Sequence, residues 1–88
     1  MHKREIVEAL IFSGSGSVSE KDILKALPET SPEELREHVD DLNRHYEETG
    51  RSFRIERASA GYLFVTREEY APYIKALHTP ARLSLPSL

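Results

Sequence analysis

Residues 52–77 read SFRIERASAGYLFVTREEYAPYIKAL, and they are the most informative part of the chain for its fold. Phe53 and Ile55 alternate with charged neighbours, which is typical of an edge strand with one buried face. Residues 62–65 are continuously apolar, as expected of a strand that is covered on both faces. Residues 58–61 supply the turn between the two strands. The stretch therefore predicts a hairpin whose second strand is the central strand of a three-stranded sheet.

A helix is predicted immediately after the hairpin. Thr66 followed by Glu69 has the spacing of a capping box, so this helix should begin near Arg67. Pro72 would tighten or kink its first turn. The apolar residues of this helix share one face: Tyr70, Tyr73, Ile74 and Leu77. Residues 79–88 contain two prolines and show no periodicity, so we expect a linker there.

The helix before the hairpin has the clearest start signal in the chain. Ser31 is the expected N-cap, Pro32 occupies the first helical position, and Glu34 completes a capping box. Gly50 is the expected left-handed residue after its end, so the helix should span residues 32–49. Its apolar residues form one narrow stripe: Leu35, Val39, Leu42 and Tyr46.

Two shorter helices are predicted at the start of the chain. The first covers residues 2–12, and a Gly/Ser loop follows it at residues 13–17. Val18 can form a short first strand, and a second helix then runs from a cap at Ser19 until Pro28 stops it. The order helix, helix, helix, hairpin, helix predicts an α+β winged helix-turn-helix domain over residues 1–78.

Composition and motifs disfavour enzymatic chemistry. The 88-residue chain carries 12 basic and 15 acidic residues and no cysteine, which excludes disulfides, thiolate zinc sites and a cysteine nucleophile. It has no glycine-rich phosphate loop and no His-Glu-x-x-His motif. His38 and His45 lie on one side of the third helix near Asp41, but a solvated flank or the rim of a protein interface explains them better than a metal site. We therefore predict no catalytic residue, no cofactor and no metal.

The charge of the third helix argues against reading of the DNA major groove. Only Arg36 and Arg44 oppose its seven acids, so its sum is 2 − 7 = −5, and phosphates would repel it. The seven acids are Glu33, Glu34, Glu37, Asp40, Asp41, Glu47 and Glu48. A DNA-binding transcriptional regulator is the alternative function, and it would have to use the wing and the first helix. Its basic residues would be Lys3, Arg4, Arg51, Arg54 and Arg57.

Docking onto protein is the favoured interpretation because the chain has more aromatic residues than a small core needs. Tyrosine and phenylalanine are enriched at protein interfaces, and arginines flank them in the wing. The candidate interface residues are Phe53, Arg54, Arg57, Tyr62, Tyr70 and Tyr73.

Three segments together resemble the N-terminal domain of segregation and condensation protein B, ScpB. They are residues 6–14 with Val18-Ser19, residues 61–66 with 69–74, and the exit at residues 80–84. The resemblance covers about residues 4–85. One departure is that Ala60 precedes Gly61 where family members usually have paired glycines.

The resemblance implies a function in chromosome condensation and segregation, and so in chromosome partition during the cell cycle and cell division. It implies a non-enzymatic, cytoplasmic and nucleoid-associated scaffold that forms a homodimer. Its partners would be a kleisin subunit (ScpA) and, through it, the SMC ATPase, with no sequence-specific DNA binding and no membrane. It also implies that residues 79–88 lead toward a second winged-helix domain.

Overall fold

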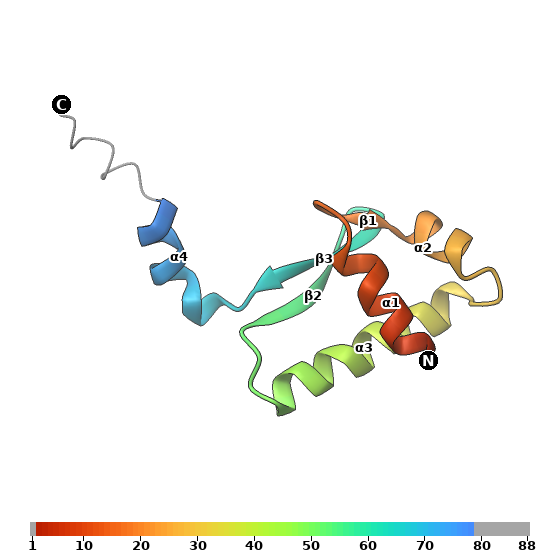
Figure 1. Cartoon of the computed structure of the whole chain (residues 1–88), viewed down its shortest axis with the longest axis horizontal. Helices are drawn as coiled ribbons and strands as arrows, with labels where there is room; N and C mark the ends of the chain where they lie inside the picture. Colours follow the sequence, from red (N-terminus) through yellow and green to blue (C-terminus); the bar gives the residue numbers. More distant parts are fainter. Residues whose placement is uncertain (1, 79–88) are drawn as a thin grey trace.

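The computed structural model describes residues 2–78, and its elements follow the predicted order (Figure 1). They are α1 (Lys3–Phe12), β1 (Val18–Ser19), α2 (Glu20–Ala26), α3 (Pro32–Glu48), β2 (Phe53–Ala58), β3 (Gly61–Thr66), the short 3-10 helix η1 (Glu68–Tyr70) and α4 (Ala71–His78). The strands form one antiparallel sheet in the order β1-β3-β2, so the second hairpin strand is central, as its continuous apolar run predicts. The predicted α+β winged-helix class is confirmed. The predicted linker at residues 79–88 lies outside the described residues.

The capping box at the start of α3 is present as predicted. The Glu34 backbone N–H donates to Ser31 Oγ at 3.1 Å, and the Ser31 backbone N–H donates to Glu34 Oε1 at 2.9 Å. That backbone hydrogen bond lowers the pKa of the Glu34 carboxyl. Gly50 follows the helix at a φ of +70°, in the left-handed region that glycine tolerates. Local sequence therefore fixes both ends of the longest helix.

One hydrophobic core joins the helices to the inner face of the sheet. The stripe predicted on α3 is buried throughout, and it packs with residues from α1, α2, β2 and β3. The buried set is Val7, Ile11, Ile23, Leu35, Val39, Leu42, Tyr46, Ile55 and Tyr62. This core supports the hairpin on which the candidate interface residues lie.

Asn43 ties α3 to the outer edge of β2. Its side-chain Nδ2 donates to the Ile55 carbonyl at 2.9 Å, and the Ile55 backbone N–H donates to its Oδ1 at 2.8 Å. Ile55 forms a non-hydrogen-bonded pair with Phe64 of β3, so its N–H and C=O point away from β3. The role of Asn43 could not be predicted from the sequence, because the residue lies in a polar run of the helix.

Replacing Asn43 with alanine should lower the free energy of unfolding by about 2 kcal/mol, because two part-buried hydrogen bonds are lost and Ile55 keeps two unpaired backbone groups. Urea denaturation followed by circular dichroism measures the loss. Arg44→Ala is the matched control, since Arg44 is exposed and its ion-pair partner on the same helix, Asp41, is exposed as well. An equal loss in the two variants would contradict the proposed role of Asn43.

In the turn between β2 and β3, Ser59 has a left-handed backbone conformation. Ser59 has a φ of +55°, and the residues that pair on either side of the turn are Ala58 and Gly61. Gly61 has a different requirement, because a Cβ built there would lie 2.3 Å from the Val18 carbonyl oxygen. The glycine therefore allows β1 to approach β3 closely.

The predicted capping box at Thr66 does not form, although helical structure begins near Arg67 as predicted, with η1. Thr66 is the last residue of β3, and the N-cap position before η1 is held by Arg67, with no side-chain hydrogen bond. The chain stays extended at Arg67, turns through η1, and begins α4 only at Ala71. Pro72 explains the delay, since it has no N–H for a helical hydrogen bond to the turn before it. α4 projects away from α1, α2 and α3 at the end of β3 (Figure 1).

Candidate protein-interaction site

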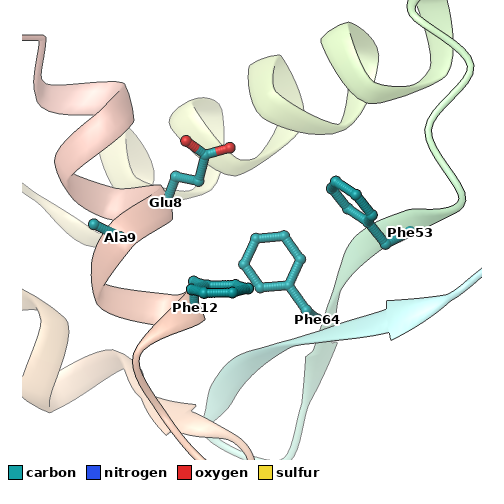
Figure 2. Close-up of a pocket in the computed structure, with 5 residues that line it drawn as sticks. All are labelled: Glu8, Ala9, Phe12, Phe53 and Phe64. Atoms are coloured by element: carbon teal, nitrogen blue, oxygen red, sulfur yellow. The ribbon is translucent and has the colours of Figure 1, made fainter.

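A shallow concavity of about 400 Å³ opens between α1 and the hairpin, and we call it the aromatic groove (Figure 2). Its lining residues are Glu8, Ala9, Phe12, Phe53 and Phe64. Three of them belong to α1, one to β2 and one to β3, so the core packing of α1 against the sheet sets its shape. Four of the five are apolar, which suits an apolar side chain or helix face more than a polar metabolite.

Edge-to-face contacts hold the rings of the groove in place. The Phe64 ring lies 5.8 Å, centroid to centroid, from Phe12 and also 5.8 Å from Phe53, at interplanar angles of 81° and 72°. The ring of Tyr46, in the core, packs edge-to-face against the Phe53 ring, with 5.0 Å between the two centroids. Phe12 is nevertheless 76% exposed. An ordered phenylalanine that remains in water is a candidate contact residue.

Phe12 and Phe64 line the groove but were not among the site residues predicted from the sequence. α1 continues to Phe12, so this residue falls outside the buried stripe that contains Val7 and Ile11. That position, an aromatic off the core stripe, was the only signal in the sequence. Phe64 could not be distinguished from a core residue because it lies within the apolar run of the central strand.

A part-buried hydrogen bond positions the acidic residue of the groove. The Tyr46 hydroxyl donates to Glu8 Oε2. Burial raises the pKa of Tyr46 above its ordinary value, and the hydrogen bond and negative charge of Glu8 raise it further. Tyr46 therefore stays protonated at neutral pH and holds the Glu8 side chain, which lines the groove from α1.

The predicted site residues in the hairpin do not form one surface. Phe53 and Arg57 lie on the inner face of β2, whereas Arg54 lies on the outer face with Glu56, 3.9 Å away. Arg57 reaches Glu20 at 3.7 Å and stands 5.9 Å above the Tyr62 ring. Tyr62 itself is only 2% exposed. We correct that prediction: Tyr62 is a core residue of this domain, and among the predicted hairpin residues Phe53 lines the groove.

The two predicted tyrosines near the C-terminal end form a second apolar surface. Tyr70 closes η1 and is half-buried, whereas Tyr73 on α4 is 75% exposed. Leu77 lies one turn further along α4 and is 66% exposed. No residue of α4 is buried against the described part of the chain. The structure thus presents an apolar groove and, separately, an apolar helix.

The basic residues of the alternative, DNA-binding function are largely paired with acids. Arg4 contacts Glu5 at 3.1 Å, and Arg54 and Arg57 pair with acids as described above. All seven acids of α3 are exposed. These charges disfavour a phosphate-binding face on either α3 or the wing.

Two further classes of site find no support in residues 2–78. No three histidine or acidic side chains are grouped there so as to hold a metal ion. His38 faces His2 and Asp41 across a small surface hollow, and His45 tilts against Tyr46. Within the same range, no helix is long and apolar enough to cross a membrane.

Comparisons with known proteins give a consistent result. The sequence model of the family "Segregation and condensation complex subunit ScpB" matches residues 5–88. Segregation and condensation protein B of Syntrophotalea carbinolica is 31% identical over 87 residues, which are 97% of this chain and 44% of that protein. The chain thus spans about half the length of the curated relative.

Two solved structures are similar in fold and sequence. A conserved hypothetical protein from Chlorobium tepidum matches with a TM-score of 0.80 and 39% identity, over 96% of this chain and 57% of that one. A dimer of the ScpB N-terminal domain complexed with ScpA peptide matches with a TM-score of 0.67 and 31% identity, over 84% of this chain and 91% of that one.

Proposed function

We propose that this chain acts as a scaffold in chromosome condensation and segregation. The chain belongs to the family of the segregation and condensation complex subunit ScpB, and the proposal starts from that membership. In this proposal it forms a homodimer and binds the kleisin subunit ScpA, and through ScpA it joins the SMC ATPase. A solved relative of this domain is a dimer that holds an ScpA peptide, which supports both contacts.

The observation that carries the proposal is the aromatic groove with its exposed Phe12. An apolar concavity with a rigid aromatic rim is suited to a helix or peptide side chain. Phe53, Tyr70 and Tyr73 stay in the proposed contact surface, now joined by Phe12 and Phe64. Arg54 and Arg57 would flank it on the two faces of the wing.

The proposed scaffold acts by binding alone, without catalysis. The family is that of a complex subunit, and the groove offers a single ionisable lining residue, Glu8. One carboxylate among apolar side chains is not a convergent set of acid, base and nucleophile. We further propose that the protein is cytoplasmic and associates with the nucleoid, where its partners act.

Size-exclusion chromatography with light scattering tests the proposed function. The chain alone should run at about twice its 10.1 kDa mass, and purified cognate ScpA should shift it to a larger species of defined stoichiometry. A fluorescent DNA duplex in low salt is the control ligand. Because α3 is acidic, we expect no binding whose affinity falls steeply as the salt concentration rises. A monomer at high concentration that ScpA does not shift would contradict the scaffold function of this domain.

A further inference from the structure

We infer that Arg67 fixes the direction in which α4 leaves the domain, and that it thereby positions the apolar surface of Tyr73 and Leu77 for a partner. The part of this inference that concerns a partner rests on the scaffold function proposed above. Arg67 lies between the end of β3 and the start of η1. It would act through α4, as a positioning residue, rather than by touching the partner itself.

η1 and α4 form one helical arm, which joins the rest of the domain at Arg67. The backbone is extended at Arg67, with φ −72° and ψ 149°, and it is already helical at Ala71, with φ −56° and ψ −42°. Pro72 stiffens the passage from η1 to α4 because its ring fixes φ. No residue of α4 is buried in the described part of the chain, so tight packing against the domain does not set its direction. The direction of the arm is therefore set where it begins.

Arg67 makes hydrogen bonds on both sides of this joint. Its backbone N–H donates to the Ser52 carbonyl at 2.9 Å, and its side-chain Nε donates to the Arg51 carbonyl at 3.0 Å. On the other side, the Tyr70 backbone N–H donates to the Arg67 carbonyl at 3.0 Å. One residue thus holds the start of the arm against the segment before β2, and α4 projects outward from there (Figure 1).

The segment that Arg67 holds is itself fixed to the core. The Arg51 backbone N–H donates to the Tyr46 carbonyl at 2.8 Å, and Tyr46 is a core residue of α3 that is only 3% exposed. Hydrogen bonds therefore run from the end of α3, through Arg51 and Arg67, to η1. The direction of α4 is set relative to the core rather than relative to a loose loop.

The side chain of Arg67 is held by the position of a donor rather than by its charge. It lines a hollow of about 290 Å³ between α3 and the wing, and Asp40 and Glu47 of α3 line the same hollow. Within residues 2–78, however, Arg67 forms no ion pair with either acid. Its side-chain hydrogen bond is the one from Nε to the Arg51 carbonyl. A side chain with an N–H at the same place should therefore replace it.

Time-resolved energy transfer between two dyes tests whether Arg67 fixes the arm. The chain has no native cysteine, so Lys21→Cys on α2 and Lys75→Cys on α4 give two exposed attachment sites. The labelled chain is diluted until it is monomeric, so that only the distance within one copy is measured. We expect a narrow distance distribution for the parent and a wider one for Arg67→Ala. The unfolding temperature should stay unchanged, because the lost hydrogen bond is exposed.

Two further substitutions separate the donor from the charge. Arg67→Gln keeps an N–H at the position of Nε, since both nitrogens are attached to Cδ, and it should retain the narrow distribution. Arg67→Lys keeps the positive charge but has a carbon at that position, so its distribution should be as wide as that of Arg67→Ala. Arg44→Ala is the matched control, because it removes another arginine from the same hollow and should leave the distribution narrow.

The affinity of self-association tests the consequence for assembly. An arm without a fixed direction must be ordered when it binds, and this ordering weakens binding. Arg67→Ala and Arg67→Lys, in chains without dyes, should therefore raise the dissociation constant of the proposed homodimer at least about fivefold. Arg67→Gln and Arg44→Ala should leave it unchanged. Sedimentation equilibrium over a dilution series measures these constants.

The outcomes separate this inference from the proposed function. An unchanged distance distribution in Arg67→Ala, or an equally wide one in Arg67→Gln, would overturn the inference and leave the scaffold function standing. A wider distribution with an unchanged dissociation constant would overturn the positioning role. A chain that is monomeric at every concentration would contradict the proposed homodimer and with it the positioning role, while the distance measurement would still decide whether Arg67 fixes the arm.

Discussion

Replacing Leu35 with alanine is expected to lower the free energy of unfolding by about 3–5 kcal/mol. Leu35 is fully buried on α3, and truncation there would leave a cavity in the single core that joins the helices to the sheet. A domain of this size has a total stability of roughly 4–13 kcal/mol. The variant should therefore be partly unfolded near physiological temperature, and chemical denaturation followed by circular dichroism will show it.

Leu77→Ala is the control for this prediction, because it makes the same chemical change on an exposed helix. Leu77 is 66% exposed and α4 buries none of its described residues, so the stability of the monomer should stay within about 0.5 kcal/mol of the parent. The comparison is made at a concentration at which both chains are monomeric, so that dimer contacts do not contribute. Similar losses in the two variants would contradict the assignment of the core.

Replacing Gly61 with alanine should be nearly as damaging, with a loss of about 3 kcal/mol. The added Cβ would lie 2.3 Å from the Val18 carbonyl oxygen and 2.8 Å from the Ser17 Oγ, so β1 must move away from β3. β1 has only two residues, and both pair with this end of β3. We therefore expect its pairing to be lost together with the stability, which denaturation and hydrogen exchange at Glu20, whose backbone N–H donates to the Ala60 carbonyl, can measure.

Gly16→Ala provides the matched control for the Gly61 substitution. A Cβ at Gly16 meets nothing within 4 Å, and Gly16 does not have a positive φ. Its substitution should leave stability unchanged or raise it slightly, because alanine restricts the unfolded chain. Equal destabilisation by the two alanines would show that flexibility of the loop, rather than close approach of β1 and β3, explains the glycine.

Features that depend on local sequence could be predicted for this fold. Ser31, Pro32 and Glu34 specify the start of α3 through contacts within four residues, and the structure has the expected hydrogen bonds. The central position of β3 followed from its unbroken apolar run. Thr66 carried an equally good capping signal, but its capping box does not form, because the chain stays extended for one more residue and Arg67 takes the N-cap position of η1.

The candidate site was less predictable because it depends on how distant elements meet. Phe12, Phe53 and Phe64 lie up to 52 positions apart in the sequence and meet only after α1 packs against the sheet. Tyr62 and Phe64 have the same pattern in the sequence, yet the first is buried and the second lines the groove. Periodicity gives the face of a strand, but it does not give the depth of a residue below a neighbouring helix.

The two hydrogen bonds from Asn43 to Ile55 also protect the outer edge of the sheet from pairing with another strand. A bare strand edge invites further strands, and a protein that pairs with itself through such an edge could grow without limit. Here the outer edge of β2 is already occupied at its middle, and the opposite edge, β1, is two residues long. Both edges of the sheet are therefore poor templates for the addition of a further strand from another copy.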